Sequence, residues 1–144
     1  MSDHHVYFAV FGFDGDPLEV TLVAGREPDD SWRKGEGFSE LMPDAQRTDN
    51  RWLLSSGLDA SASHRDHFEK LLLKLESLGD RLAALQARYR CGIGVSQYFF
   101  MDHPEFYLPA ELLARFRQLG VPVSFSQLGL DADPEPSADQ PDAT

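Results

Sequence analysis

Short apolar runs rich in aromatic and β-branched residues predict strands in four parts of the chain, residues 5–13, 51–57, 91–100 and 121–128. The first run ends in the turn residues Asp-Gly-Asp-Pro, and we expect it to be a central strand. In the third run, Ile93, Val95 and Gln97 alternate with other residues and should share one face. The fourth alternates apolar and polar positions after Pro122, which favours a half-exposed edge strand.

A different spacing, with steps of three and four, marks the stretch from Ser63 to about Arg90. Its recurring apolar positions predict one long helix with a single apolar face, formed by Phe68, Leu71, Leu72, Leu75, Leu78, Leu82 and Leu85. Ser63 followed by Asp66 is a plausible N-terminal cap, and Gly79 suggests a slight bend or close packing.

A second helix is predicted over residues 108–120, with Pro109 in its first turn and Gly120 at its end. Its apolar stripe is expected to comprise Leu112, Leu113, Phe116 and Leu119. Residues 17–25 suit a short helix or a strand, and we favour the helix because Pro17 and Glu19 are good first-turn residues.

Two further stretches are less regular. Residues 31–38 are a candidate short strand, and residues 41–50 form a polar excursion.

Strands therefore alternate with helices that each have one apolar stripe. This pattern predicts an α+β fold, a two-layer sandwich in which a mainly antiparallel or mixed sheet of about five strands carries two main helices on one face. We expect one domain over residues 1–130 and a disordered, acidic, Pro-rich tail over residues 131–144.

The chain of 144 residues has a net charge of −11, and five acids without any base lie in residues 131–144. The remaining body is still acidic, which argues against nucleic-acid binding because that depends on clustered Lys and Arg. No apolar run approaches the length needed to cross a bilayer, and the N-terminus lacks the features of a secretory signal. The single cysteine, Cys91, suits a reducing compartment, so we expect a cytoplasmic protein.

Few residues indicate catalysis. His64 and His67 have the spacing of a metal-binding pair but lack further ligands, so we interpret them as surface residues and expect no metal. Cys91 is interpreted as a buried structural residue. Asp14 and Gly15 are expected to form a turn, with Asp16 capping the next element. No catalytic residues or cofactor are predicted.

Positive charge and tryptophan concentrate in one region. Five of the thirteen bases lie within 26 residues, at Arg26, Arg33, Lys34, Arg47 and Arg51. Arginine matches carboxylate or phosphate groups and stacks on indole, so one interpretation of these residues is a groove for an anionic ligand. Its candidate residues are Arg26, Trp32, Arg33, Lys34 and Trp52. The other interpretation, which we favour, is structural, with Trp32 covering one end of the sheet and the bases paired with Asp29, Asp30 or Glu36, because the acidic body offers the bases ample local partners.

Four motifs follow one another along the chain: Gly25, Pro28 and Ser31 to Glu36 (Ser-Trp-Arg-Lys-Gly-Glu), then Trp52 to Ser56, then the helices "HFEKLLLKLESL" and "LLARFRQLG". In these motifs and their order the chain resembles the bacterial domain-of-unknown-function 4279 family. The resemblance covers roughly residues 5 to 127 and implies an α+β fold in a small cytoplasmic bacterial protein. It supplies no catalytic or binding residues. The chain lacks the Tyr near which the closing strand usually ends, and the acidic tail looks like an addition.

Two functions follow as hypotheses. The first is a non-enzymatic interaction protein that masks a partner protein, as immunity proteins do, because an acidic surface suits a basic partner and fast association. The second is a small anionic-ligand-binding protein or enzyme with a site around Trp32, Arg33 and Trp52. The sequence makes no prediction of the oligomeric state.

Overall fold

The computed structural model describes residues 2–39, 42–100 and 106–130. Within them the strands are β1 (Ser2–Phe11), β2 (Asp30–Trp32), β3 (Gly37–Ser39), β4 (Met42–Gln46), β5 (Arg51–Ser55), β6 (Arg90–Phe100) and β7 (Val123–Leu130). The helices are α1 (Pro17–Ala24), α2 (His64–Leu78), α3 (Asp80–Arg88) and α4 (Ala110–Leu119).

Five of these strands form one mixed sheet in the order β2-β5-β1-β6-β7. β1 pairs antiparallel with both β5 and β6, which confirms the prediction of a central N-terminal strand. β6 and β7 run parallel because α4 carries the chain back between them. β7 occupies one edge of the sheet, as its alternating pattern and Pro122 indicated.

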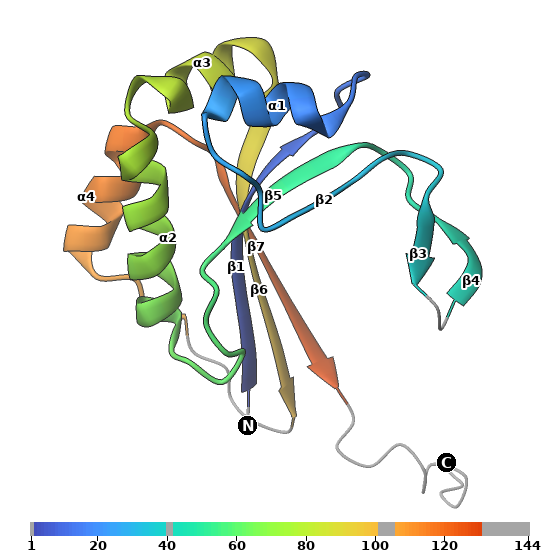
Figure 1. Cartoon of the computed structure of the whole chain (residues 1–144). Helices are drawn as coiled ribbons and strands as arrows, with labels where there is room; N and C mark the ends of the chain where they lie inside the picture. The colour runs from blue at the N-terminus through green and yellow to red at the C-terminus, as the bar shows by residue number, and fades with distance from the viewer. Residues whose placement is uncertain (1, 40–41, 101–105, 131–144) are drawn as a thin grey trace, which may run out of the picture.

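All four helices cover the same face of this sheet (Figure 1). The core between the two layers is built from alternate residues of the strands, such as Val6, Phe8 and Val10 of β1, and from the apolar faces of the helices. Ile93, Val95 and Gln97 are all buried on this side, as predicted. The α+β sandwich expected from the sequence is therefore confirmed, with four helices instead of two main ones in the described residues.

The long predicted helix is two helices. Gly79 has φ 58° and ψ −130°, a conformation that ends α2 and starts α3, so the expected slight bend is a complete break. The predicted cap is present, because the Asp66 N–H donates to Ser63 Oγ at 3.1 Å. In α4 the stripe prediction is wrong at Leu113, which is 51% exposed, since it lies on the side of the helix that faces away from the core.

The segment after β1 forms the short helix α1, which confirms the favoured alternative. Asp16 caps it by accepting the Leu18 N–H at 2.9 Å, and Pro17 occupies its first turn. Gly25 ends it in the left-handed conformation, with φ 67°.

Between β2 and β5 the chain departs from the prediction. The expected strand over residues 31–38 pairs with β5 only up to Trp32, and the supposed polar excursion contains β4, which forms a separate two-stranded sheet with β3. This β3–β4 hairpin lies on the other side of the sheet from α2 and α4 (Figure 1).

The predicted disordered tail, residues 131–144, lies outside the described residues. Among the helices that the structure describes, none has the length and apolar character required to traverse a bilayer.

Candidate functional site

The face of the sheet that the helices leave uncovered, here called the open face, carries the side chains of Tyr7, Ala9 and Phe11 from β1. Opposite Tyr7 and Ala9, β6 contributes Gly94 and Gly92. A Cβ atom on Gly94 would lie 2.4 Å from Cζ of Tyr7, so the tyrosine ring occupies the space that a side chain would take. The Gly-Ile-Gly sequence of β6 therefore accommodates an aromatic residue of the neighbouring strand.

A hollow of about 480 Å³ lies on the open face and is lined by Tyr7, Phe11, Arg51, Arg90 and neighbouring residues of β6 and β7. The guanidinium groups of Arg51 and Arg90 lie 5.4 and 5.0 Å from the centroid of the Phe11 ring. Arg51 is paired with Asp49 at 3.2 Å. Within the part of the chain that the structure describes, no carboxylate lies within ion-pairing distance of Arg90.

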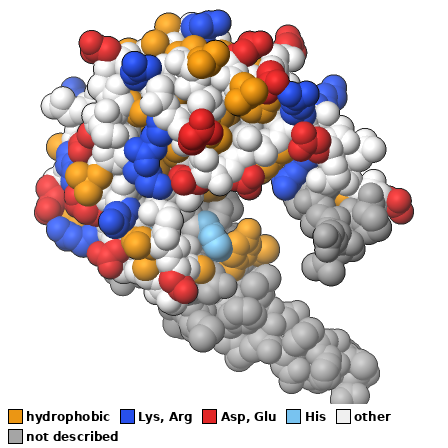
Figure 2. All heavy atoms as spheres, viewed as in Figure 1, with side chains coloured by type: hydrophobic (Ala, Val, Ile, Leu, Met, Phe, Trp, Pro, Cys, Tyr) orange, Lys and Arg blue, Asp and Glu red, His pale blue; other side chains and the backbone are white. Residues whose placement is uncertain are grey.

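The space-filling view shows hydrophobic side chains gathered beside a histidine on the side of the body that faces the β3–β4 hairpin (Figure 2). Uncovered faces of two-layer folds are usually polar because water covers them. The hollow on the open face, where the guanidinium of Arg90 lies beside the ring of Phe11, is therefore a candidate binding surface.

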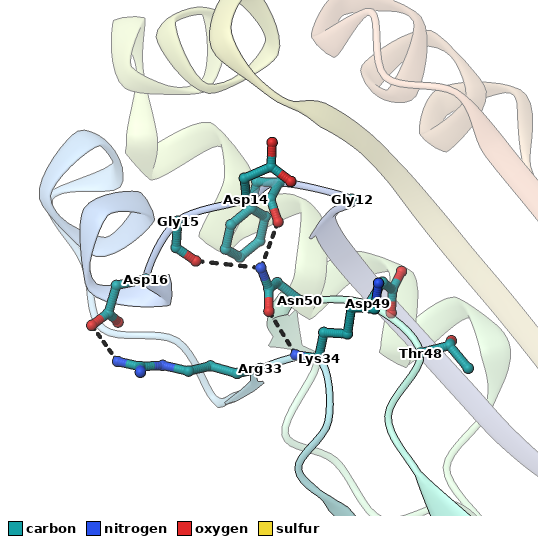
Figure 3. Close-up of a pocket in the computed structure, with 10 residues that line it drawn as sticks. Gly12, Asp14, Gly15, Asp16, Arg33, Lys34, Thr48, Asp49 and Asn50 are labelled. Atoms are coloured by element: carbon teal, nitrogen blue, oxygen red, sulfur yellow. Dashed lines mark hydrogen bonds and ion pairs between the residues drawn. The ribbon is translucent and has the colours of Figure 1, made fainter.

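A second hollow, of about 580 Å³, lies among the loops at the end of β1 and is lined by residues 12–16, 33–34 and 48–50 (Figure 3). Asn50 holds these loops together. Its amide donates to the Phe13 carbonyl at 2.5 Å, and its Oδ1 accepts the Lys34 backbone N–H at 2.6 Å. The loop conformation is thus set by one side chain that satisfies backbone groups of two segments.

The charges around this second hollow do not favour an anion. Asp14, Asp16 and Asp49 line it together with Arg33 and Lys34, so carboxylates outnumber bases. Arg33 already forms an ion pair with Asp16. An anionic ligand would have to displace that carboxylate and approach the two others.

The structure does not bring the five predicted ligand-binding residues to one cavity. Trp52 is fully buried in the core, where its Nε1 donates to Thr21 Oγ1 at 3.0 Å. Trp32 is half-buried at the sheet edge, with the Arg47 guanidinium 3.7 Å from its ring centroid. Arg33 and Lys34 line the loop hollow, and Arg33 also lines a smaller hollow of about 170 Å³ together with Trp32.

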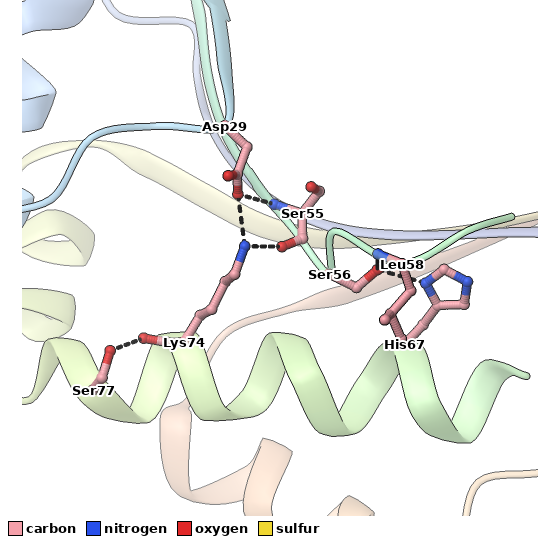
Figure 4. Close-up of polar contacts among 7 residues, drawn as sticks. All are labelled: Asp29, Ser55, Ser56, Leu58, His67, Lys74 and Ser77. Atoms are coloured by element: carbon pink, nitrogen blue, oxygen red, sulfur yellow. Dashed lines mark hydrogen bonds and ion pairs between the residues drawn. The ribbon is translucent and has the colours of Figure 1, made fainter. Parts of the chain in front are cut away.

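The fifth of these residues, Arg26, is half-buried near Asp29, which joins three elements (Figure 4). Asp29 Oδ2 accepts the Ser55 N–H at 2.8 Å and the Lys74 ammonium at 3.0 Å. Burial alone would raise the pKa of Asp29, but these hydrogen bonds and the charges of Lys74 and Arg26 lower it. The cluster fixes β2 and β5 to α2.

The prediction that His64 and His67 lie on the surface is wrong. They are 7% and 2% exposed, because the first turn of α2 packs over the start of β1. The His64 ring stacks between His4, at 3.8 Å, and Phe106, at 4.2 Å between centroids. His67 Nδ1 lies 2.6 Å from Ser56 Oγ (Figure 4).

Both imidazoles are held neutral. Burial, with a smaller contribution from His4 and then His67, lowers the pKa of His64 to about 4. Burial also lowers the pKa of His67. The Nε2 atoms of both rings are buried without a hydrogen-bond partner in the described structure. No acceptor at Nε2 therefore stabilises the protonated form of either ring.

These histidines do not form a metal centre with other side chains, since no three His, Cys, Asp or Glu of the described residues are placed to share an ion. Cys91 is half-buried, and burial raises the pKa of its thiol to about 11. That thiol is therefore a poor nucleophile near neutral pH.

Comparison with known proteins agrees with the resemblance noted above. The model of the family described as a domain of unknown function, DUF4279, matches residues 2–130. The chain belongs to this family. No curated protein and no solved structure matches it. Membership in DUF4279 assigns no role to any residue.

Sequence reasoning missed the open face, although it left a trace in the sequence. The sequence pattern identifies Tyr7, Ala9 and Phe11 only as part of a central strand and does not indicate that one face of this strand stays uncovered. The two glycines of β6 opposite them were the available signal, because small residues in the middle of a strand indicate close approach of another group.

Proposed function

We propose that this protein acts by binding a partner protein through the open face of its sheet. The observation that supports the proposal is the hollow of about 480 Å³ on that face, with Tyr7 and Phe11 in its lining and Arg90 without a carboxylate partner among the described residues. Both rings are half-buried, and Arg90 beside them is exposed. Tyrosine and arginine are enriched at interaction sites.

The chemistry of the open face indicates what it binds. The aromatic rings and glycines favour apolar side chains of a partner segment, and Arg90 favours a carboxylate beside them. The net charge of −11 adds long-range attraction for a partner that is basic overall. The role we propose is therefore the masking of a protein partner, without catalysis by this chain.

Site-specific photo-crosslinking in the cells that make the protein tests this proposal. A benzophenone amino acid placed at the exposed Ser124, in the lining of the hollow, should give one cross-linked species whose mass differs from that of two copies of this chain. The same amino acid at Leu73, which is 53% exposed on α2, is the matched control and should not give that species. Equal cross-linking from both positions, or none from Ser124, would overturn the proposal.

The partner identified in this way then provides a quantitative test. With both proteins purified, Arg90→Glu should weaken binding by about tenfold or more, because it places a like charge against the partner's carboxylate. Leu73→Ser should leave the affinity unchanged. An Arg90→Glu chain that binds as tightly as the wild type would exclude the open face as the contact surface.

A further inference from the structure

The outer edge of β7 has no strand beside it in the part of the chain that the structure describes. Residues 123–130 read "VSFSQLGL" and include neither a charged residue nor a proline. Exposed edge strands usually carry such residues because they prevent pairing with other chains. Two large apolar side chains of β7 are also half-exposed, Phe125 at 53% and Leu128 at 50%. The outer edge of β7 is therefore suited to pairing with a strand of another chain.

The pairing of β7 with β6 shows which backbone groups are available. The Ile93 N–H donates to the Pro122 carbonyl at 2.8 Å, and Ile93 lies opposite Val123. In a parallel ladder with this register, Val123 and every second residue after it direct their N–H and C=O groups away from β6. The backbone N–H and C=O groups of Phe125 and Gln127 therefore point outward, where a second strand can form hydrogen bonds with them.

We propose that β7 pairs antiparallel with β7 of a second copy of this chain, about a two-fold axis at Ser126. This register places Phe125 opposite Gln127 of the other copy and makes use of every outward group from Val123 to Gly129. About eight hydrogen bonds would join the copies. The two sheets continue into a single sheet with its helices on one face.

Charge complementarity favours a second copy as the occupant. The chain continues from Leu130 into the acidic residues 131–144, which contain no base. At the opposite end of β7 lie Arg88, in the last turn of α3, and Arg117, in the last turn of α4. Gln86 donates to the Leu119 carbonyl at 3.1 Å, which joins those two helix ends.

Neither arginine forms an ion pair within the described structure. Antiparallel pairing brings the start of each acidic segment to the arginine end of the other copy. The attraction between these opposite charges offsets part of the repulsion between two acidic bodies.

Sedimentation equilibrium of the full chain tests the pairing. We expect a dimer with a dissociation constant of about 1–100 µM, as for a small interface. Gln127→Pro removes an outward N–H and leaves the β6 ladder complete, so it should raise the dissociation constant about tenfold or more. Gln127→Ala loses the same side-chain contact with Gln97 but keeps the N–H, and should dimerise as the wild type does. Equal melting temperatures of the two variants would show that both are folded.

Disulfide trapping tests the register. Ser126 faces its own copy across the axis as a non-hydrogen-bonded pair, whose Cα atoms lie about 4.5 Å apart, within disulfide range. Ser126→Cys should therefore cross-link under oxidised glutathione, whereas Ser124→Cys, which lies opposite Leu128, should not.

Two results would overturn the proposal. A chain that stays monomeric up to about 200 µM leaves the edge free for another occupant. A dimer that Gln127→Pro does not weaken uses another surface. A chain shortened to residues 1–130 should dimerise more weakly than the full chain, because it lacks the five acidic residues that face the arginines of the other copy. None of these results bears on partner binding at the open face, so the two proposals fail separately.

Discussion

Replacing His64 with phenylalanine should remove a defined part of the protein's sensitivity to acid. His64 is stacked between His4 and Phe106, and its pKa is lowered from 6.5 to about 4, first by burial and then by the neighbouring histidines. Because the folded pKa lies below the unfolded value, the unfolded chain binds the proton more tightly. The contribution of neutral His64 to the free energy of unfolding is fully present above pH 6.5 and is lost as the pH falls toward 4.

The size of the loss follows from the two pKa values. Each pH unit below 6.5 lowers the free energy of unfolding by about 1.4 kcal/mol, until the folded protein also takes up the proton. At about pH 5 the loss from His64 is therefore about 2 kcal/mol, while at about pH 7.5 it is negligible. A phenylalanine ring retains the stacking and cannot be protonated, so the variant should lose about 2 kcal/mol less than the wild type between these pH values.

Urea unfolding followed by tryptophan fluorescence measures this difference, since Trp52 is buried in the core. Some pH dependence should remain in the variant because burial also lowers the pKa of His67. Phe68→Leu disturbs the same group of rings, with its ring 6.1 Å from that of His64, but keeps the imidazole. It should show the full pH dependence. Equal losses of stability in the wild type and the phenylalanine variant would refute the reasoning.

Three further substitutions test the packing described above. Gly94→Ala should lower the free energy of unfolding by about 1–3 kcal/mol, because its Cβ would lie 2.4 Å from the Tyr7 ring. Gly92→Ala should change it by less than about 0.5 kcal/mol in the same urea assay, because the nearest atom to its Cβ, on the Phe11 ring, would be 3.7 Å away. Asn50→Ala should cost about 1–2 kcal/mol and speed amide exchange in the loops that it joins; unchanged exchange would contradict its role. Arg115→Gln breaks pairs with two glutamates of α2 that are partly exposed, so a thermal melt should show a loss of at most about 1 kcal/mol that shrinks in high salt.

Sequence patterns were informative where the deciding interactions are local. Ser63 and Asp16 cap the helices that follow them, and Gly25 ends α1, because each acts on backbone groups within a few residues. The period of apolar positions likewise identified the strands and the apolar faces of the helices. The break at Gly79 was underestimated because a glycine inside an apolar helical pattern is compatible with both a bend and a break.

The candidate site was less predictable because its features depend on which segments meet. Trp52 and Trp32 look alike in the sequence, yet one is fully buried against α1 and the other lies at the sheet edge under Arg47. The order of strands places β5 inside the sheet and β2 at its edge, and no local pattern encodes that order. The same applies to His64 and His67, whose burial results from α2 packing over β1.

By itself, the sequence determined the fold class, most of the helices and strands, and the family, since these follow from local propensities and from the alternation of apolar and polar residues. Only the tertiary structure decided which of those apolar residues would be covered. β1 is apolar on both faces, but the helices cover one face alone, so Tyr7 and Phe11 remain on the open one. Burial is a property of residues brought together from distant parts of the chain, and for this reason the surfaces proposed for binding became visible only in the fold.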